Sequence, residues 1–137
     1  MGPKALLAAA PAAVIPFVRE FGSCSEAIAD ACLNRLAHLS LVARDASAVE
    51  ATLRALTADP DAIGAVLSTW RAHQDCPSVR DAAYMLTCGL AMFDKAAANE
   101  VAQAGGVEPL VESLKQQLQR TKMAETGVRA IRALADS

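Results

Sequence analysis

Apolar residues recur along the chain with the spacing of amphipathic helices. In three stretches, 14–21, 63–70 and 107–114, apolar side chains occupy the first, fourth, fifth and eighth positions. This spacing places them on one face of a helix. The stretches align without gaps and start 49 and 44 residues apart, close to the roughly 40–47 residues of helical solenoid repeats. The pattern predicts an internally repeated helical protein.

A longer helix is expected after each of these stretches. The three segments, 25–39, 78–91 and 122–135, share a Leu-Ala pair near their ends. Polar residues suited to cap a helix N-terminus lie at or before their starts. These capping candidates are Ser23, Ser78 and Thr121.

A shorter helix is expected before the second and third of these pairs. One runs from Ser47 to Leu56 and ends at the Asp-Pro-Asp sequence 59–61. The other follows Asp94 as its N-cap and ends at the glycine pair 105–106, because glycine readily adopts the left-handed conformation common after a helix. The predicted unit is therefore a short helix followed by two longer ones, and the first unit lacks most of its short helix.

Composition supports the same fold class. The chain has 31 alanines and 15 leucines, whereas aromatic residues make up only 4%. Alanine and leucine favour helices, and aromatic residues favour strands. We therefore predict one all-α domain over residues 1–137, a solenoid of three units at about 5–41, 45–92 and 94–137.

The third unit resembles a known repeat. Residues 99–114, NEVAQAGGVEPLVESL, resemble the armadillo repeat signature around its Ala-Gly-Gly sequence, and residues 130–135, AIRALA, resemble the end of that repeat's third helix. The first two units share mainly the apolar skeleton. The resemblance implies an armadillo-like right-handed α-α superhelix whose third helices line a concave groove.

The chain departs from peptide-binding armadillo proteins at the positions that contact the peptide. Those proteins carry a ladder of asparagines, often beside tryptophan, on successive third helices. Here the asparagine positions hold Arg35, Cys88 (or Gly89, if the register shifts by one) and Ala133. Binding of an extended basic peptide, as in nuclear import adaptors, is therefore not expected. The single tryptophan, Trp70, lies on an apolar stripe and is expected in the core.

The exposed side chains of the third helices form the predicted binding surface. Arginine and tyrosine are frequent hot spots of protein interfaces. The predicted partner-binding residues are Asn34, Arg80, Tyr84, Cys88, Arg129 and Arg132. A partner that is acidic, or that has an aromatic or aliphatic anchor, would suit them. Self-association is also expected, because the chain's last third helix has no polar capping helix after it.

Other kinds of partner are not expected. A net charge of −2 lacks the basic excess of nucleic-acid-binding proteins. The apolar run 5–18 resembles the core of a signal peptide, but Pro11 and Pro16 interrupt it, and it is too short to span a membrane. Four irregularly spaced cysteines and two histidines indicate no metal site. Reduced thiols favour the cytoplasm, with the nucleus as an alternative.

No catalytic constellation emerges, so we expect no enzymatic activity and no cofactor. The predicted function is a non-catalytic scaffold or adaptor that binds a protein through its third helices or its exposed ends. One alternative is a structural segment of a larger armadillo protein. Another is a small thiol-dependent redox or regulatory protein using Cys24 or Cys76, with His73 close to Cys76 in sequence.

Overall fold

The computed structural model describes residues 11–39, 46–117 and 121–135. Every regular element within these residues is a helix, so the predicted all-α class is confirmed. Residues 5–10 of the apolar run 5–18 lie outside the described residues. Residues 11–18 of that run belong to the first helix listed below. The helices are α2 (Pro11–Phe21), α3 (Glu26–Ala37), α4 (Ala46–Ala58), α5 (Ala62–Ala72), α6 (Pro77–Phe93), α7 (Lys95–Gln103), α8 (Val107–Gln117) and α9 (Thr121–Ala135).

Two predicted helix-end signals around α7 are confirmed. Asp94 precedes α7, and its Oδ1 accepts a hydrogen bond of 2.7 Å from the Ala97 N–H. After the helix, Gly105 adopts a φ of 85°, in the left-handed region that glycine enters without strain. The Gly106 N–H then donates to the Val101 carbonyl oxygen at 2.9 Å. Residues close in sequence therefore set both ends of this helix.

Other predicted helix starts are wrong in detail. Ser25, rather than Ser23, precedes α3, and its hydroxyl accepts a 3.3 Å hydrogen bond from the Ile28 N–H. Cys76 precedes α6, so Ser78 lies inside the first turn of that helix. The side chain of Thr121, the third candidate, lies outside the described side chains. The expected short helix of the second unit is also longer than predicted, since α4 has 13 residues and α5 has 11.

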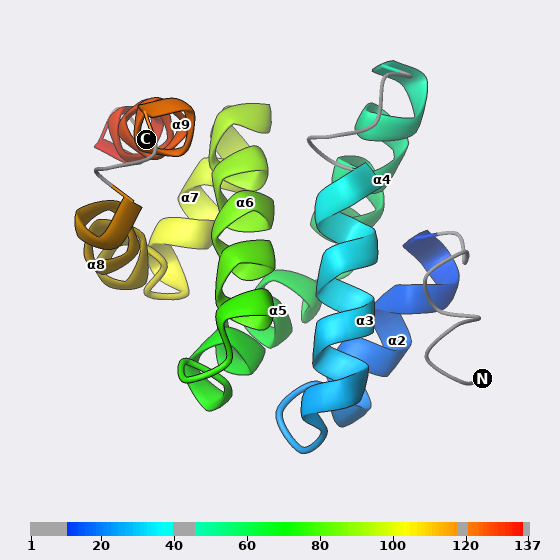
Figure 1. The fold of residues 1–137 in the computed structure, drawn as a ribbon. Coiled ribbons are helices and arrows are strands. Elements are labelled where there is room, and N and C mark those ends of the chain that lie inside the picture. The colour runs from blue at the N-terminus through cyan, green and yellow to red at the C-terminus, as the bar shows by residue number, and fades with distance from the viewer. Residues whose placement is uncertain (1–10, 40–45, 118–120, 136–137) are drawn as a thin grey trace.

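One hydrophobic core connects all the described helices. Helix α6 lies at its centre, where it contacts α3 on one side and α9 on the other (Figure 1). Small residues such as Ala82 and Ala83 are buried along α6, which allows neighbouring helices to approach closely. Trp70 is only 2% exposed, so its predicted place in the core is confirmed.

Three of the helix pairs that the repeat alignment equates are in contact. Helix α3 contacts α6, α6 contacts α9, and α2 contacts α5. In Figure 1, α3 and α6 run side by side up the page, whereas α8 and α9 are seen almost along their axes. The last pair of helices is therefore turned steeply relative to α6, unlike the small rotation between neighbours in a regular solenoid.

Candidate functional site

Two residues predicted to contact a partner are instead buried. Tyr84 and Cys88 both have 0% exposure, because α6 is covered by α3 and α9. The Tyr84 hydroxyl forms hydrogen bonds with the Cys88 side chain and with the backbone of Gly127 in α9. Burial raises the pKa of Tyr84 above its ordinary value and raises the pKa of Cys88 to about 12. Their predicted place on the binding surface is wrong, and they join α6 to α9.

Asn34 links α3 to the start of α6. Its side-chain amide donates to the Asp30 carbonyl oxygen at 2.8 Å, to Asp30 Oδ1 at 2.7 Å and to Ser78 Oγ at 3.2 Å. The Ser78 hydroxyl donates to the same Asp30 carboxylate. The two amide hydrogens of Asn34 are therefore already used within the protein. This network stabilises the α3–α6 contact.

Arg129 and Arg132 are exposed on the outer face of α9. Val128, beside them, is 46% exposed. These arginines therefore lie on a surface, as predicted, but Tyr84 and Cys88 do not share that surface. The structure does not bring the six predicted residues together into one site.

The sixth residue, Arg80, lines a groove between α5, α6 and α8, which we call the α5–α8 groove. The groove has a volume of about 470 Å³. The buried side chains of Trp70 and Ser113 contribute to its wall. Most of its remaining lining is polar or charged: Arg71, Gln74, Asp75, Glu108, Glu112 and Gln116.

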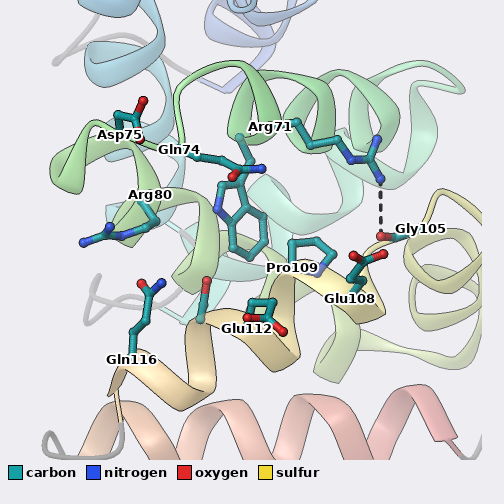
Figure 2. A pocket seen from close by; sticks show the side chains of 11 residues that line it. Arg71, Gln74, Asp75, Arg80, Gly105, Glu108, Pro109, Glu112 and Gln116 are labelled. Atoms are coloured by element: carbon teal, nitrogen blue, oxygen red, sulfur yellow. Dashed lines mark hydrogen bonds between the residues drawn. The ribbon is translucent and has the colours of Figure 1, made fainter.

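Charges of both signs border the α5–α8 groove. Figure 2 shows Asp75 and Arg80 at one end, and Arg71 and Glu108 at the other. Arg71 Nη2 donates to the Ala104 and Gly105 carbonyl oxygens at 3.1 and 3.3 Å. The Arg71 guanidinium is therefore engaged with the chain segment that follows α7.

Arg80 lacks such a partner. Its Nε atom is buried, and no hydrogen-bond partner for it exists among the described residues. Leaving a buried donor without an acceptor is unfavourable by about 1–3 kcal/mol, and more for a charged group. Buried polar groups in folded proteins are therefore almost always satisfied. Thr69 Oγ1 and Thr87 Oγ1 are likewise buried without a partner among the described residues, but of the three residues only Arg80 lines the α5–α8 groove.

A related groove of about 680 Å³ lies one unit earlier, against α2 and α5. Asp61, just before α5, and the α5 residues 64, 65 and 68 line it, and the repeat alignment matches them to residues 105, 108, 109 and 112 of the α5–α8 groove. The arginine of the earlier groove, Arg19, pairs with Asp59 at 3.2 Å. The two grooves therefore share one aligned wall, and of their three arginines, Arg19, Arg71 and Arg80, only Arg80 has a side chain without a partner among the described residues.

The thiols and histidines do not assemble into a recognisable reactive centre. Cys24 is exposed and Cys76 is half-buried, in the connections before α3 and α6. His73 Nε2 lies 2.7 Å from the Gly22 carbonyl oxygen, so this nitrogen carries the hydrogen and donates it. Among the described residues, no group of three or more His, Cys, Asp or Glu could hold a metal ion.

The sequence analysis missed the polar residues that α5 and α8 contribute to the α5–α8 groove. They lie on the solvent-facing sides of amphipathic helices for which we had assigned only the apolar, core-facing stripe. One signal was present, because Glu108, Glu112 and Gln116 recur every four residues and so share one face of α8. Nothing local indicated that Arg80 would lie opposite that face.

Comparison with known proteins finds no match among protein-family models, curated proteins or solved structures. No helix of the described chain is long and apolar enough to cross a membrane. The armadillo resemblance therefore rests on residues 99–114 and 130–135 of the sequence itself.

Proposed function

We propose that the chain is a non-catalytic protein-binding module of armadillo type, and that its partner binds in the α5–α8 groove. The observation that supports this proposal is Arg80, a half-buried arginine in the wall of the groove that has no ion-pair partner among the described residues. A groove built from packed helices loses little conformational entropy when a partner binds. Arginine is also among the residues that contribute most to the affinity of protein interfaces.

The α5–α8 groove replaces the concave third-helix surface as the preferred site. That surface depended on Tyr84 and Cys88, which are buried. Arg129 and Arg132 remain exposed on α9 and provide a second surface for comparison. All four cysteines are free, which suits a reducing compartment such as the cytoplasm or the nucleus.

Affinity capture from an extract of the source cells, read by quantitative mass spectrometry, tests the proposal. The baits are the wild type, R80Q, and R129Q/R132Q as a control that removes charge from the other surface. We expect a partner that the wild type and the α9 variant retain and that R80Q loses. A photo-crosslinking residue at Gln116 should label that partner, whereas the same residue at the exposed Ala51 of α4 should not.

Three other outcomes would contradict this assignment. Loss of the partner with R129Q/R132Q alone would move the site to the outer face of α9. Equal capture by all three baits would favour the exposed ends of the helical stack. No specific capture by any bait would favour a structural segment of a larger armadillo protein. Circular dichroism must first establish that the three baits are equally helical.

A further inference from the structure

The chemistry of the α5–α8 groove indicates which kind of partner segment it would take. Arg80 is half-buried and lines the groove, and it forms no ion pair with a described residue. Because its Nε is buried, a ligand can meet the guanidinium only at its two Nη atoms, whose N–H groups can bind both oxygens of a carboxylate. A carboxylate is therefore the group that best satisfies Arg80.

The described residues of the groove do not supply this carboxylate. Asp75 is exposed at the same end of the groove (Figure 2), but the ion pairs of the described residues do not include one between Asp75 and Arg80. Glu112 instead lies 3.4 Å from Lys115 on its own helix. No described residue therefore balances the charge of Arg80, and a carboxylate of a partner would do so.

The earlier groove provides an internal comparison. There the Arg19 guanidinium lies 3.2 Å from the Asp59 carboxylate, so its charge is balanced within the protein. The corresponding groove one unit later has no such pair for Arg80. Arg19 and Arg80 occupy different helices, α2 and α6, so the comparison concerns only whether the arginine of each groove is paired within the described residues.

The α8 wall of the groove favours a positively charged group on the ligand. Glu108 and Glu112 are both exposed there, and Arg71 is already bonded to backbone carbonyl oxygens. A segment with many acidic residues would be repelled by these carboxylates, whereas a purely basic segment would leave Arg80 without a partner. A ligand of mixed charge satisfies both walls. The Gln74 and Gln116 amides can both donate to and accept from a peptide backbone.

We propose that the α5–α8 groove binds a short extended peptide segment of a partner protein, with one Asp or Glu side chain on Arg80 and one Lys or Arg side chain facing Glu108 and Glu112. The groove volume of about 470 Å³ lies within the roughly 300–1,000 Å³ of small-ligand sites, which suits a few residues rather than a whole domain. This inference rests on the proposed protein-binding function and specifies the chemistry of the partner.

A phage library that displays random 12-residue peptides tests the inference, with the wild-type protein as bait and R80Q for counter-selection. We expect the enriched peptides to combine an acidic residue with a Lys or Arg. The best peptide is then synthesised, labelled with fluorescein and titrated by fluorescence anisotropy. Urea unfolding of each protein variant verifies that it is folded at the assay temperature.

Five variants separate the roles of the groove residues. R80Q should weaken binding at least about tenfold, because a hydrogen-bonded charge pair is lost. R80K keeps the charge but not the two-point geometry, so its affinity should lie between those of R80Q and the wild type. D75N should strengthen binding by removing a like charge near the ligand carboxylate. E108Q/E112Q should weaken it, and R129Q, the matched control on α9, should leave it unchanged.

The peptide provides the reciprocal test. Replacing its acidic residue by the corresponding amide should weaken binding to the wild type but add little to the effect of R80Q, because both changes remove the same contact. Likewise, replacing its Lys or Arg by Gln should remove the effect of E108Q/E112Q. Additive effects in these two cycles would overturn the assigned contacts.

Three results would overturn the inference. Peptides without an acidic residue that still lose affinity in R80Q would refute the charge assignment while leaving the α5–α8 groove as a protein-binding site. Peptides that respond to R129Q rather than to R80Q would refute the groove itself and with it the proposed function. Failure of the wild type to enrich any peptide would refute binding of a short segment, and capture through Arg80 from cell extract would then decide the proposed function separately.

Discussion

Replacing Gly127 by alanine should destabilise this protein, although glycine-to-alanine changes inside helices are usually stabilising. Gly127 lies within α9 and is buried against Tyr84 of α6. A Cβ atom built on Gly127 meets the Tyr84 hydroxyl oxygen too closely for any real contact. It also lies 3.0 Å from Leu114 Cδ1 and 3.2 Å from Tyr84 Cζ. Tyr84 has 0% exposure, so its ring cannot move aside into solvent.

The expected magnitude follows from two opposing effects. Alanine is favoured over glycine in a helix interior by about 0.5–1 kcal/mol. Forcing an extra methyl group into a filled core is unfavourable by about 1–3 kcal/mol. We therefore expect Gly127→Ala to lower the free energy of unfolding by about 1–2 kcal/mol. The matched control is Gly64→Ala in α5, where the new Cβ has no neighbour within 4 Å. It should raise the free energy by about 0.5–1 kcal/mol.

Urea unfolding, followed by circular dichroism and by the fluorescence of Trp70, measures these changes. The decisive background is Tyr84→Phe, which removes the hydroxyl oxygen that the new methyl group meets. In that background, Gly127→Ala should lower the free energy of unfolding by at least about 1 kcal/mol less than in the wild type, because the two sites are in direct contact. An equal loss in both backgrounds would refute this explanation. So would a stabilising effect of Gly127→Ala in the wild type.

Three further predictions concern buried thiols, a helix cap and thiol reactivity. The contribution of the buried thiols to the free energy of unfolding should be constant up to about pH 8 and fall above the ordinary thiol pKa of 9.0. The reason is that burial raises the pKa of Cys32 to about 11 and that of Cys88 to about 12 in the folded state only. Each thiol should contribute a fall of about 1.4 kcal/mol per pH unit between its unfolded and folded pKa, and equal urea midpoints at pH 8 and pH 10.5 would contradict this. Asp94→Ala should lower the free energy of unfolding by about 1 kcal/mol through loss of the α7 cap. Asp94→Asn should lower it less, because asparagine can also cap a helix. Equal losses of stability in the two variants would argue against capping. In the native protein the exposed Cys24 should react with iodoacetamide much faster than the buried Cys32 and Cys88. In urea the three thiols should react at similar rates. Equal rates in the native protein would show that the core opens readily.

The features that were predictable from the sequence depend on neighbours within one helix or turn. The apolar stripe that contains Trp70 indicated a helix and its buried face, and both are present. The carboxylate of Asp94 caps the helix that immediately follows it. Gly105 adopts the left-handed conformation expected of a glycine just after a helix. Each signal acts over a few residues, so the rest of the chain has little influence on it.

The errors concern residues whose environment comes from distant segments. Tyr84 and Cys88 were assigned to a surface because a helix at the edge of a core has one buried face. Helix α6 lies between α3 and α9, so both of its sides are covered. Ser78 has the sequence context of a cap, but its hydroxyl donates to Asp30 of α3, which is 48 residues away. A single helix pattern does not show how many neighbours a helix has.

The sequence alone was sufficient to predict an all-α chain with a repeated apolar pattern, because helix propensity and helical periodicity are local properties. The α5–α8 groove was decided only by the tertiary structure. Its walls come from residues 70–80 and 105–116, and their separation depends on how the units on either side of α6 pack together. The buried Nε of Arg80 lacks an acceptor in the described chain because of that packing, since hydrogen bonding depends on distances between atoms and not on residue order.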